Sequence, residues 1–218
     1  MHRHVFNDRQ SAGTLLGADV SKAELQHPVV LGLPRGGVPV AARVAQAINA
    51  PLDVILVRKL GFPRQPELAM GAIGEDGVVI INHDVVRSTR VGDDEFAAVQ
   101  SRERAELDRR LGYIREVRPR EPLQGCSAVI VDDGIATGAT VRAAIGVARA
   151  NGAREVTVAT PVAPAEVVQM LALEADRVIC LAQPDPFGSV GRWYRNFDAV
   201  SDSEVVELMS NAMENKKP

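Results

Sequence analysis

The stretch Ala128–Thr140, A-V-I-V-D-D-G-I-A-T-G-A-T, decides the fold. Its first four residues are small or apolar and three of them are β-branched, which predicts a strand buried on both faces of a parallel sheet. Asp132 and Asp133 end this strand, and a glycine-containing loop leads into a predicted helix. Loop amides, hydroxyls and a helix N-terminus together form a site for an anion such as phosphate. A sugar phosphate fits both halves, because its hydroxyls can donate to the two carboxylates.

This stretch resembles the phosphoribosyl pyrophosphate (PRPP) signature of the type I phosphoribosyltransferases: four apolar residues, two acids, and a loop of glycine and threonine. The resemblance implies that Asp132 and Asp133 are catalytic, orient the ribose hydroxyls and hold Mg²⁺ mainly through water or PRPP. The alternative is an ordinary strand-to-helix turn with acids at the strand end. The residues that the resemblance assigns to the 5′-phosphate are Gly134, Ile135, Ala136, Thr137, Gly138 and Thr140.

A second strand-loop-helix pattern lies earlier in the chain. The apolar run Val29–Leu33 predicts a strand, and it ends in Pro34-Arg35-Gly36-Gly37. Paired glycines let backbone amides approach an anion, and an arginine adds a charged fork. The pattern resembles the pyrophosphate loop of the same family, although a glycine-rich connector would look similar. Two such loops fit a ligand that carries phosphate at both ends, as PRPP does.

The next predicted strand, Asp53–Arg58, ends in the basic pair Arg58 and Lys59. In doubly wound sheets the carboxyl ends of the strands line the ligand crevice. The resemblance therefore implies that Arg58 binds pyrophosphate and that Lys59 is a catalytic residue that caps it. A solvated basic pair at the surface is the alternative.

Residues 59–82 are predicted to be a flexible insertion. Leu60–Met70 reads as irregular, and the chain around Asp76-Gly77 reads as a β-hairpin. In the family the corresponding insertion closes over the substrates, so Glu67 is a further catalytic candidate, with an exposed loop charge as the alternative.

Where 6-oxopurine enzymes of the family have an aspartate this chain has Ala136, so we expect the acceptor not to be a 6-oxopurine.

The remaining pattern sets the fold class. Helices are predicted over Phe6–Val20 and Asp93–Val117, and further strands over Glu155–Thr160 and Arg177–Ala182. Strands and helices alternate, which predicts a doubly wound, mostly parallel α/β sheet of about five strands with helices on both faces. We expect one domain over residues 1–218.

A small hood is expected from the two ends of the chain, residues 1–27 and 183–200. Four of the eight aromatic residues lie in the second of these segments. The resemblance implies that the hood holds the acceptor, with Phe187 and Trp193 stacking on a planar ring. A small satellite core is the alternative.

Composition narrows the partners. The chain has 218 residues and a formal net charge of −3, so its composition gives no electrostatic reason to expect a nucleic-acid partner. No apolar run reaches membrane-spanning length and the first residues are too polar for a signal peptide, so we expect a cytoplasmic protein without a membrane partner. The sequence does not fix the oligomeric state, and a homodimer is one assembly compatible with it.

The predicted function is Mg²⁺-dependent transfer of the 5-phosphoribosyl group from PRPP to a nitrogenous base or related acceptor, with release of pyrophosphate. The alternative is a catalytically silent PRPP- or nucleotide-binding regulator with the same fold, since fold alone does not separate the two.

Overall fold

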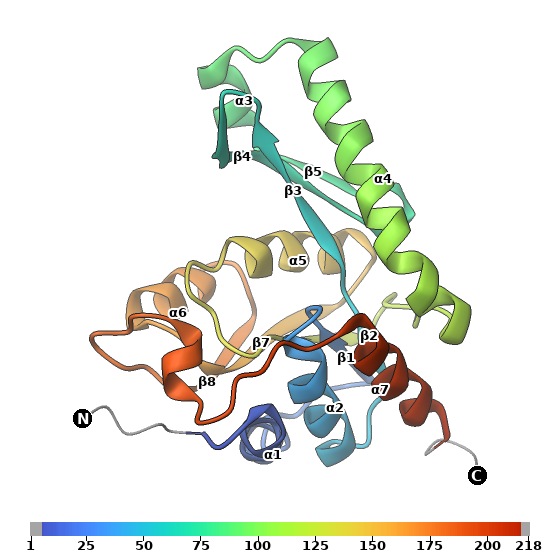
Figure 1. Cartoon of the computed structure of the whole chain (residues 1–218), viewed down its shortest axis with the longest axis vertical. Coiled ribbons are helices and arrows are strands. Elements are labelled where there is room, and N and C mark those ends of the chain that lie inside the picture. The colour runs from blue at the N-terminus through green and yellow to red at the C-terminus, as the bar shows by residue number, and fades with distance from the viewer. Residues whose placement is uncertain (1–5, 215–218) are drawn as a thin grey trace.

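A computed structural model describes residues 6–214, without the side chains of Glu67, Asp76, Met213 and Glu214. Its centre is a five-stranded parallel sheet in the order β2-β1-β6-β7-β8, which confirms the predicted α/β class (Figure 1). The order turns back between β1 and β6, and this is the position where doubly wound sheets open a ligand crevice. The strands are β1 (Pro28–Gly32), β2 (Leu52–Val54), β6 (Ser127–Val131), β7 (Glu155–Val162) and β8 (Arg177–Ala182).

Helices cover both faces of this sheet (Figure 1). Alternate residues of each strand point to opposite faces, so Val30 and Val129 join one apolar cluster while Leu31 and Ile130 join another. The first cluster lies beneath α1 (Arg9–Val20) and α2 (Gly37–Ala47), and the second lies beneath α5 (Ala139–Ala150) and α6 (Ala165–Leu171). Burial on both faces explains why these strands are almost uniformly apolar.

Residues 57–117 form an arm that rises from the sheet (Figure 1). It holds an antiparallel sheet of β3 (Val57–Phe62), β4 (Gln65–Gly74) and β5 (Val79–Ile81), followed by α3 (His83–Thr89) and α4 (Asp93–Val117). The hairpin around residues 74–77 is confirmed, with a 3-10 turn at Glu75–Gly77.

Two predictions for this region were wrong. Asp53–Arg58 is not one strand, because β2 ends at Val54 and Arg58 lies in the antiparallel β3. Leu60–Met70 is mostly strand, because β3 pairs with β4 from Val57 opposite Gly74 to Phe62 opposite Gln65, although the register shifts on both sides of Gly61. Pro63 lies at the turn of this hairpin, and Pro66 lies where its register shifts, between the pairs Phe62–Gln65 and Gly61–Ala69.

An ion-pair network ties the arm to the sheet. Arg115 of α4 donates to Asp53 Oδ1 in β2 at 2.8 Å and to Glu75 Oε1 at the ribbon turn at 2.6 Å. Asp53 is almost fully buried and also accepts from the amide of Glu121 at 2.9 Å. A buried carboxylate needs such partners, because desolvation of an unpaired charge is costly.

The C-terminal segment adds an element that was not predicted from the sequence. Helix α7 (Asp202–Glu214) buries Val205 and Met209 in the cluster that also contains residues of α2 and α4. Of the first 27 residues, Phe6 pairs with the 183–200 segment, while α1 packs against α2 with Gly17 close to Ala47. Among residues 6–214, no helix is both long and apolar enough to span a bilayer.

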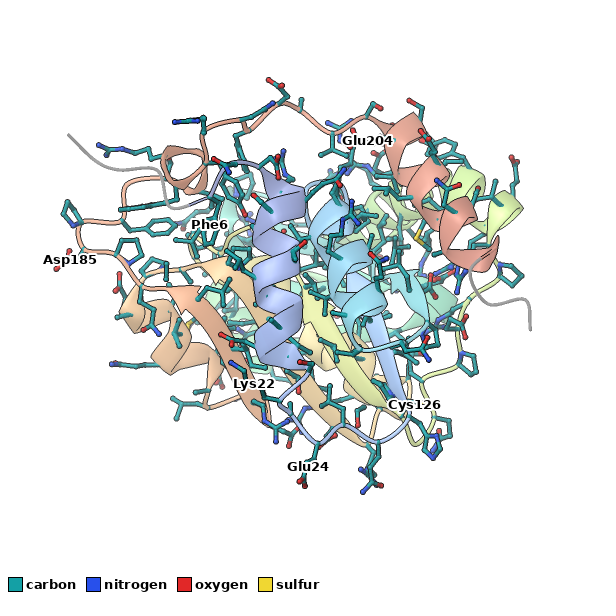
Figure 2. The ribbon with its side chains drawn as sticks, turned by 90° about the horizontal axis from the view of Figure 1, so that it is seen from below. Phe6, Lys22, Glu24, Cys126, Asp185 and Glu204 are labelled. Atoms are coloured by element: carbon teal, nitrogen blue, oxygen red, sulfur yellow. The ribbon has the colours of Figure 1, made fainter. Side chains whose placement is uncertain are left out.

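The amino-terminal and carboxyl-terminal ends of the parallel strands lie on opposite sides of the molecule. Figure 2 places Phe6 and Glu204 toward one side of the molecule and Lys22, Glu24 and Cys126 toward the other. Cys126 directly precedes β6, so its side is the amino-terminal edge of the strands. The two predicted phosphate loops and the acid pair follow β1 and β6 and therefore lie at the opposite, carboxyl-terminal ends of the strands.

Candidate active site at the ends of strands β1 and β6

The acid pair directly follows β6. The Asp133 amide donates to Asp132 Oδ1 at 2.9 Å, and this bond fixes the turn of the backbone between the two acids. Asp132 is half-buried. Burial first, and then the charge of Asp133, raise the pKa of Asp132 well above its ordinary value. A bound cation, or hydroxyl groups that donate to the acids, would favour the ionised form of this pair.

Arg9 is the partner of Asp133. Its Nε donates to Asp133 Oδ2 at 2.7 Å, with the two side chains 12% and 13% exposed. Arg9 also donates to the carbonyl of Asp198 at 2.7 Å and lies 3.9 Å from the centre of the Phe197 ring. Burial raises the pKa of Asp133, and the Arg9 guanidinium opposes that rise. Arg9 was not predicted from the sequence, because no local pattern links residues 124 positions apart.

The two predicted loops meet at these acids. A Cβ atom on Gly36 would lie 2.0 Å from Asp133 Oδ2, and one on Gly37 would lie 2.6 Å from the Val131 carbonyl oxygen. Only glycine allows this approach. Gly32 of β1 is also paired with Val131 of β6, so the strands bring the loops together. The peptide bond between Pro34 and Arg35 is cis.

Arg35 itself is exposed, and its Nη1 lies 3.7 Å from Asp202 Oδ1 at the start of α7. A pair this open to solvent contributes little stability. Its guanidinium is therefore accessible to an anion.

The 134–140 loop presents donors to solvent. Gly138, at φ +76°, is the N-cap residue of α5, and no side chain caps the first turn of that helix. Uncapped first-turn amides are the groups that bind phosphate at a helix N-terminus. Ala136, Thr137 and Thr140 lie around them, and all three are exposed. Ile135 does not offer a group to a phosphate, because its side chain is in the core and its amide already donates to the carbonyl of Val162 at 2.9 Å.

The exposed hydroxyl of Thr137 gives a direct test of this loop. A Thr137→Val change keeps the shape of the side chain but removes one donor, so ribose 5-phosphate affinity should fall by about 1.5–3 kcal/mol, the worth of a hydrogen bond to a charged group. Calorimetric titration of the wild type and the variant would measure the difference. An equal affinity would mean that Thr137 faces away from the phosphate.

A cavity of about 400 Å³ adjoins both loops. It brings together Arg35, Arg58 and Thr140, three of the predicted ligand residues. Arg58 is held by Glu103 of α4, with Nε and Nη2 at 2.9 and 2.5 Å from Oε2. Helix α4 also contributes Arg109, Arg110 and Tyr113, from a helix whose alternating charges are typical of a solvated face.

The two remaining catalytic candidates lie in the arm. Lys59 is exposed on β3 and is not among the residues that line this cavity. Successive residues of a strand point to opposite faces, so Lys59 and Arg58 cannot serve the same side of the ribbon. Glu67 belongs to β4, but its side chain lies outside the described part, so its role stays a prediction.

The aromatic residues of the 183–200 segment form a small core with Phe6. Trp193 is 9% exposed, and its Nε1 donates to the carbonyl of Phe187 at 3.0 Å. Tyr194 stacks on Phe197, with ring centres 5.0 Å apart. The satellite core is therefore present, and Phe187, which is only half-buried, is the more accessible of the two acceptor candidates.

Tyr194 connects this aromatic core to the acid pair. Its hydroxyl donates to the backbone carbonyl of Asp133 at 2.6 Å, and burial raises the pKa of the phenol. A Tyr194→Phe variant would leave that buried carbonyl unsatisfied, so we expect the free energy of unfolding to fall by about 1–3 kcal/mol. Urea denaturation would measure it. A loss below about 0.5 kcal/mol, the lower end of the net worth of a hydrogen bond, would show that water replaces the hydroxyl.

The acids suit a magnesium ion that is shared with a substrate. Among the described residues, no group of three or more His, Cys, Asp or Glu side chains is arranged to hold a metal. Mg²⁺ needs no such cage, since it keeps several waters and binds through one or two carboxylates together with substrate phosphates. Asp132 and Asp133 match that donor set.

Comparisons with known proteins bear on the family of this chain. A family model described as "Phosphoribosyl transferase domain" matches residues 11–182. Two Mycobacterium tuberculosis proteins, from strains CDC 1551 and H37Rv, are both named "Putative phosphoribosyl transferase" and are 53% identical to this chain over 208 residues. That match covers 95% of this chain and 47% of each relative, so the chain spans about half the length of these curated relatives.

The solved structure of TT1426 from Thermus thermophilus has the same fold. It superposes with a TM-score of 0.89 at 41% identity, and the match covers 94% of this chain and 98% of that one. The family match spans most of the chain, including both loops and the acid pair. The chain therefore belongs to the type I phosphoribosyltransferase family.

Proposed function

We propose that the protein transfers the 5-phosphoribosyl group from PRPP to a nitrogenous base or related acceptor and releases pyrophosphate. The observation that carries this proposal is the contact between the two loops. Asp133 packs against Gly36 at the ends of the adjacent strands β1 and β6, so one ligand can touch both loops and both acids. Such a ligand carries an anion at each end and hydroxyls between them, which describes PRPP.

In this reaction the bond between ribose C1 and the pyrophosphate oxygen breaks, and its electron pair leaves with pyrophosphate. A nitrogen of the acceptor then forms a bond to C1. The transition state resembles an oxocarbenium ion, as in glycoside cleavage. Positioning and charge stabilisation therefore dominate catalysis.

Each part of the site has a role in that step. Uncapped amides at the start of α5 and the Thr137 hydroxyl hold the 5′-phosphate. Asp132 and Asp133 orient the ribose hydroxyls and would hold Mg²⁺, which neutralises charge on the pyrophosphate when bound. Arg35 and the amides of Gly36 and Gly37 bind the leaving group.

The acceptor should not be a 6-oxopurine. Ala136 is exposed in the 5′-phosphate loop, and its methyl group cannot accept a proton from a base. That proton must go to another group, and Glu67 of the arm remains our candidate for it. Phe187 at the edge of the aromatic core would stack on a planar acceptor.

Turnover is tested by incubating the protein with Mg²⁺, PRPP and a panel of nucleobases and related heterocycles while pyrophosphate is measured. We expect release with an acceptor other than hypoxanthine or guanine. Saturable PRPP binding without release for any acceptor would support a silent PRPP-binding regulator instead. Efficient use of hypoxanthine or guanine would contradict the acceptor class.

A further inference from the structure

The wall of the cavity opposite Arg35 is built by the arm. We propose that Arg109 and Arg110 of α4 bind the outer phosphate of the pyrophosphate group, so that the arm completes the leaving-group site. This inference rests on the proposed function, because it takes Arg35 as the residue that holds the inner part of the same group. The cavity is continuous from Arg35 to α4.

The cavity has an excess of positive charge. Four arginines line it, Arg35, Arg58, Arg109 and Arg110, against one lining carboxylate, Asp202. Arginine guanidinium groups are charged donors to phosphate oxygens, which makes them suited to this ligand. Glu103 and Glu106 pair with three of these arginines, so one positive charge remains in excess, and this excess favours an anion over an uncharged acceptor.

The two α4 arginines are held in place before any ligand binds. Glu106 accepts from Arg109 Nε at 2.8 Å and from Arg110 Nε at 2.7 Å. These hydrogen bonds lower the pKa of Glu106 to about 2. One carboxylate shared by two guanidinium groups leaves a net positive charge.

Tyr113 fixes the direction of Arg109 as well. Its hydroxyl accepts from Arg109 Nη1 at 2.8 Å, and the ring lines the cavity. Arg58 on β3 is oriented in the same way by Glu103. The arm thus presents three oriented guanidinium groups to the cavity, and a preorganised site loses less entropy when it binds an anion.

The test compares three ligands by calorimetry in the presence of Mg²⁺: inorganic pyrophosphate, PRPP and ribose 5-phosphate. In the double variant Arg109→Ala, Arg110→Ala we expect pyrophosphate and PRPP affinity to fall about tenfold or more, with ribose 5-phosphate affinity unchanged. The two side chains are 60% and 49% exposed, so the fold should tolerate the change. Arg87→Ala is the matched control, because Arg87 is an exposed arginine of α3 in the same arm, paired with Asp84 at 2.6 Å.

The outcomes separate this inference from the proposed function. Unchanged pyrophosphate and PRPP affinity in a folded double variant would overturn the α4 site and leave the PRPP proposal standing. An equal loss for ribose 5-phosphate would also overturn it, because the effect would then be general. If the wild type bound pyrophosphate through these arginines but bound neither PRPP nor ribose 5-phosphate, the α4 site would stand and the proposed function would fail.

Discussion

Replacing Arg9 with alanine should lower the free energy of unfolding by about 3–5 kcal/mol, because it leaves the Asp133 carboxylate buried without its cation. Both side chains are almost enclosed, and Asp133 Oδ2 is 2.7 Å from Arg9 Nε. The variant also removes the contact over the Phe197 ring and the bond to the Asp198 carbonyl. We therefore expect the aromatic core of the 183–200 segment to loosen together with the acid pair.

Urea denaturation over a range of pH would isolate the charge effect. Without Arg9 the pKa of Asp133 rises further, because burial is no longer opposed. The deficit of the variant should therefore be largest at neutral pH and shrink as the pH falls and Asp133 takes up a proton. Arg149→Ala is the control, since its pair with Asp176 is about half exposed and should be worth less than about 1 kcal/mol. If the loss in free energy of unfolding did not change with pH, the whole effect would come from lost packing and not from the unpaired charge.

The double change Asp132→Asn, Asp133→Asn should weaken Mg²⁺-dependent PRPP binding at least about 100-fold, as expected when two charged hydrogen-bonding partners are lost. The amides keep the shape of the acids but cannot hold the metal or accept from ribose hydroxyls as a charged group does. In the wild type, PRPP affinity should rise with pH, because binding requires the ionised form of Asp132 and burial raises its pKa. In the double variant that pH dependence should be absent.

Calorimetry at several pH values, with circular dichroism as the control for folding, would test this. The double variant should keep cooperative unfolding, because the amide oxygen of an asparagine side chain can still accept the hydrogen bond that Arg9 donates to Asp133 in the wild type. PRPP affinity equal to that of the wild type would remove the acid pair from the ligand site.

Features with a local sequence pattern were predicted well. The run Ala128–Val131 predicted a strand buried on both faces, and β6 is buried along its whole length. The acidic start at Asp93 marked the N-terminus of α4, and its predicted end at Val117 is also the observed one. The same holds for the loop between Asp132 and Thr140, because a strand, two acids and a glycine-bounded turn are consecutive in sequence.

Features that depend on contacts distant in sequence were not predicted. Arg9 contacts Asp133 only because the start of α1 lies near the end of β6, and nothing near Arg9 in the sequence signals it. Arg109 and Arg110 alternate with acids, which is typical of a solvated helix, and only the packing of α4 on the ribbon turns them toward the cavity. The hairpin at Phe62–Gln65 was hidden by Pro63 at its turn and by Pro66, which lies where the register of the ladder shifts. Proline is tolerated at turns and at such irregularities.

Titration of the wild type with PRPP, in the presence and absence of Mg²⁺, tests most directly whether the acid pair and its two loops bind PRPP. We predict saturable binding at one site per chain, strengthened by Mg²⁺ and competed by ribose 5-phosphate. Absence of saturable PRPP binding under both conditions, by a correctly folded protein, would contradict this central claim.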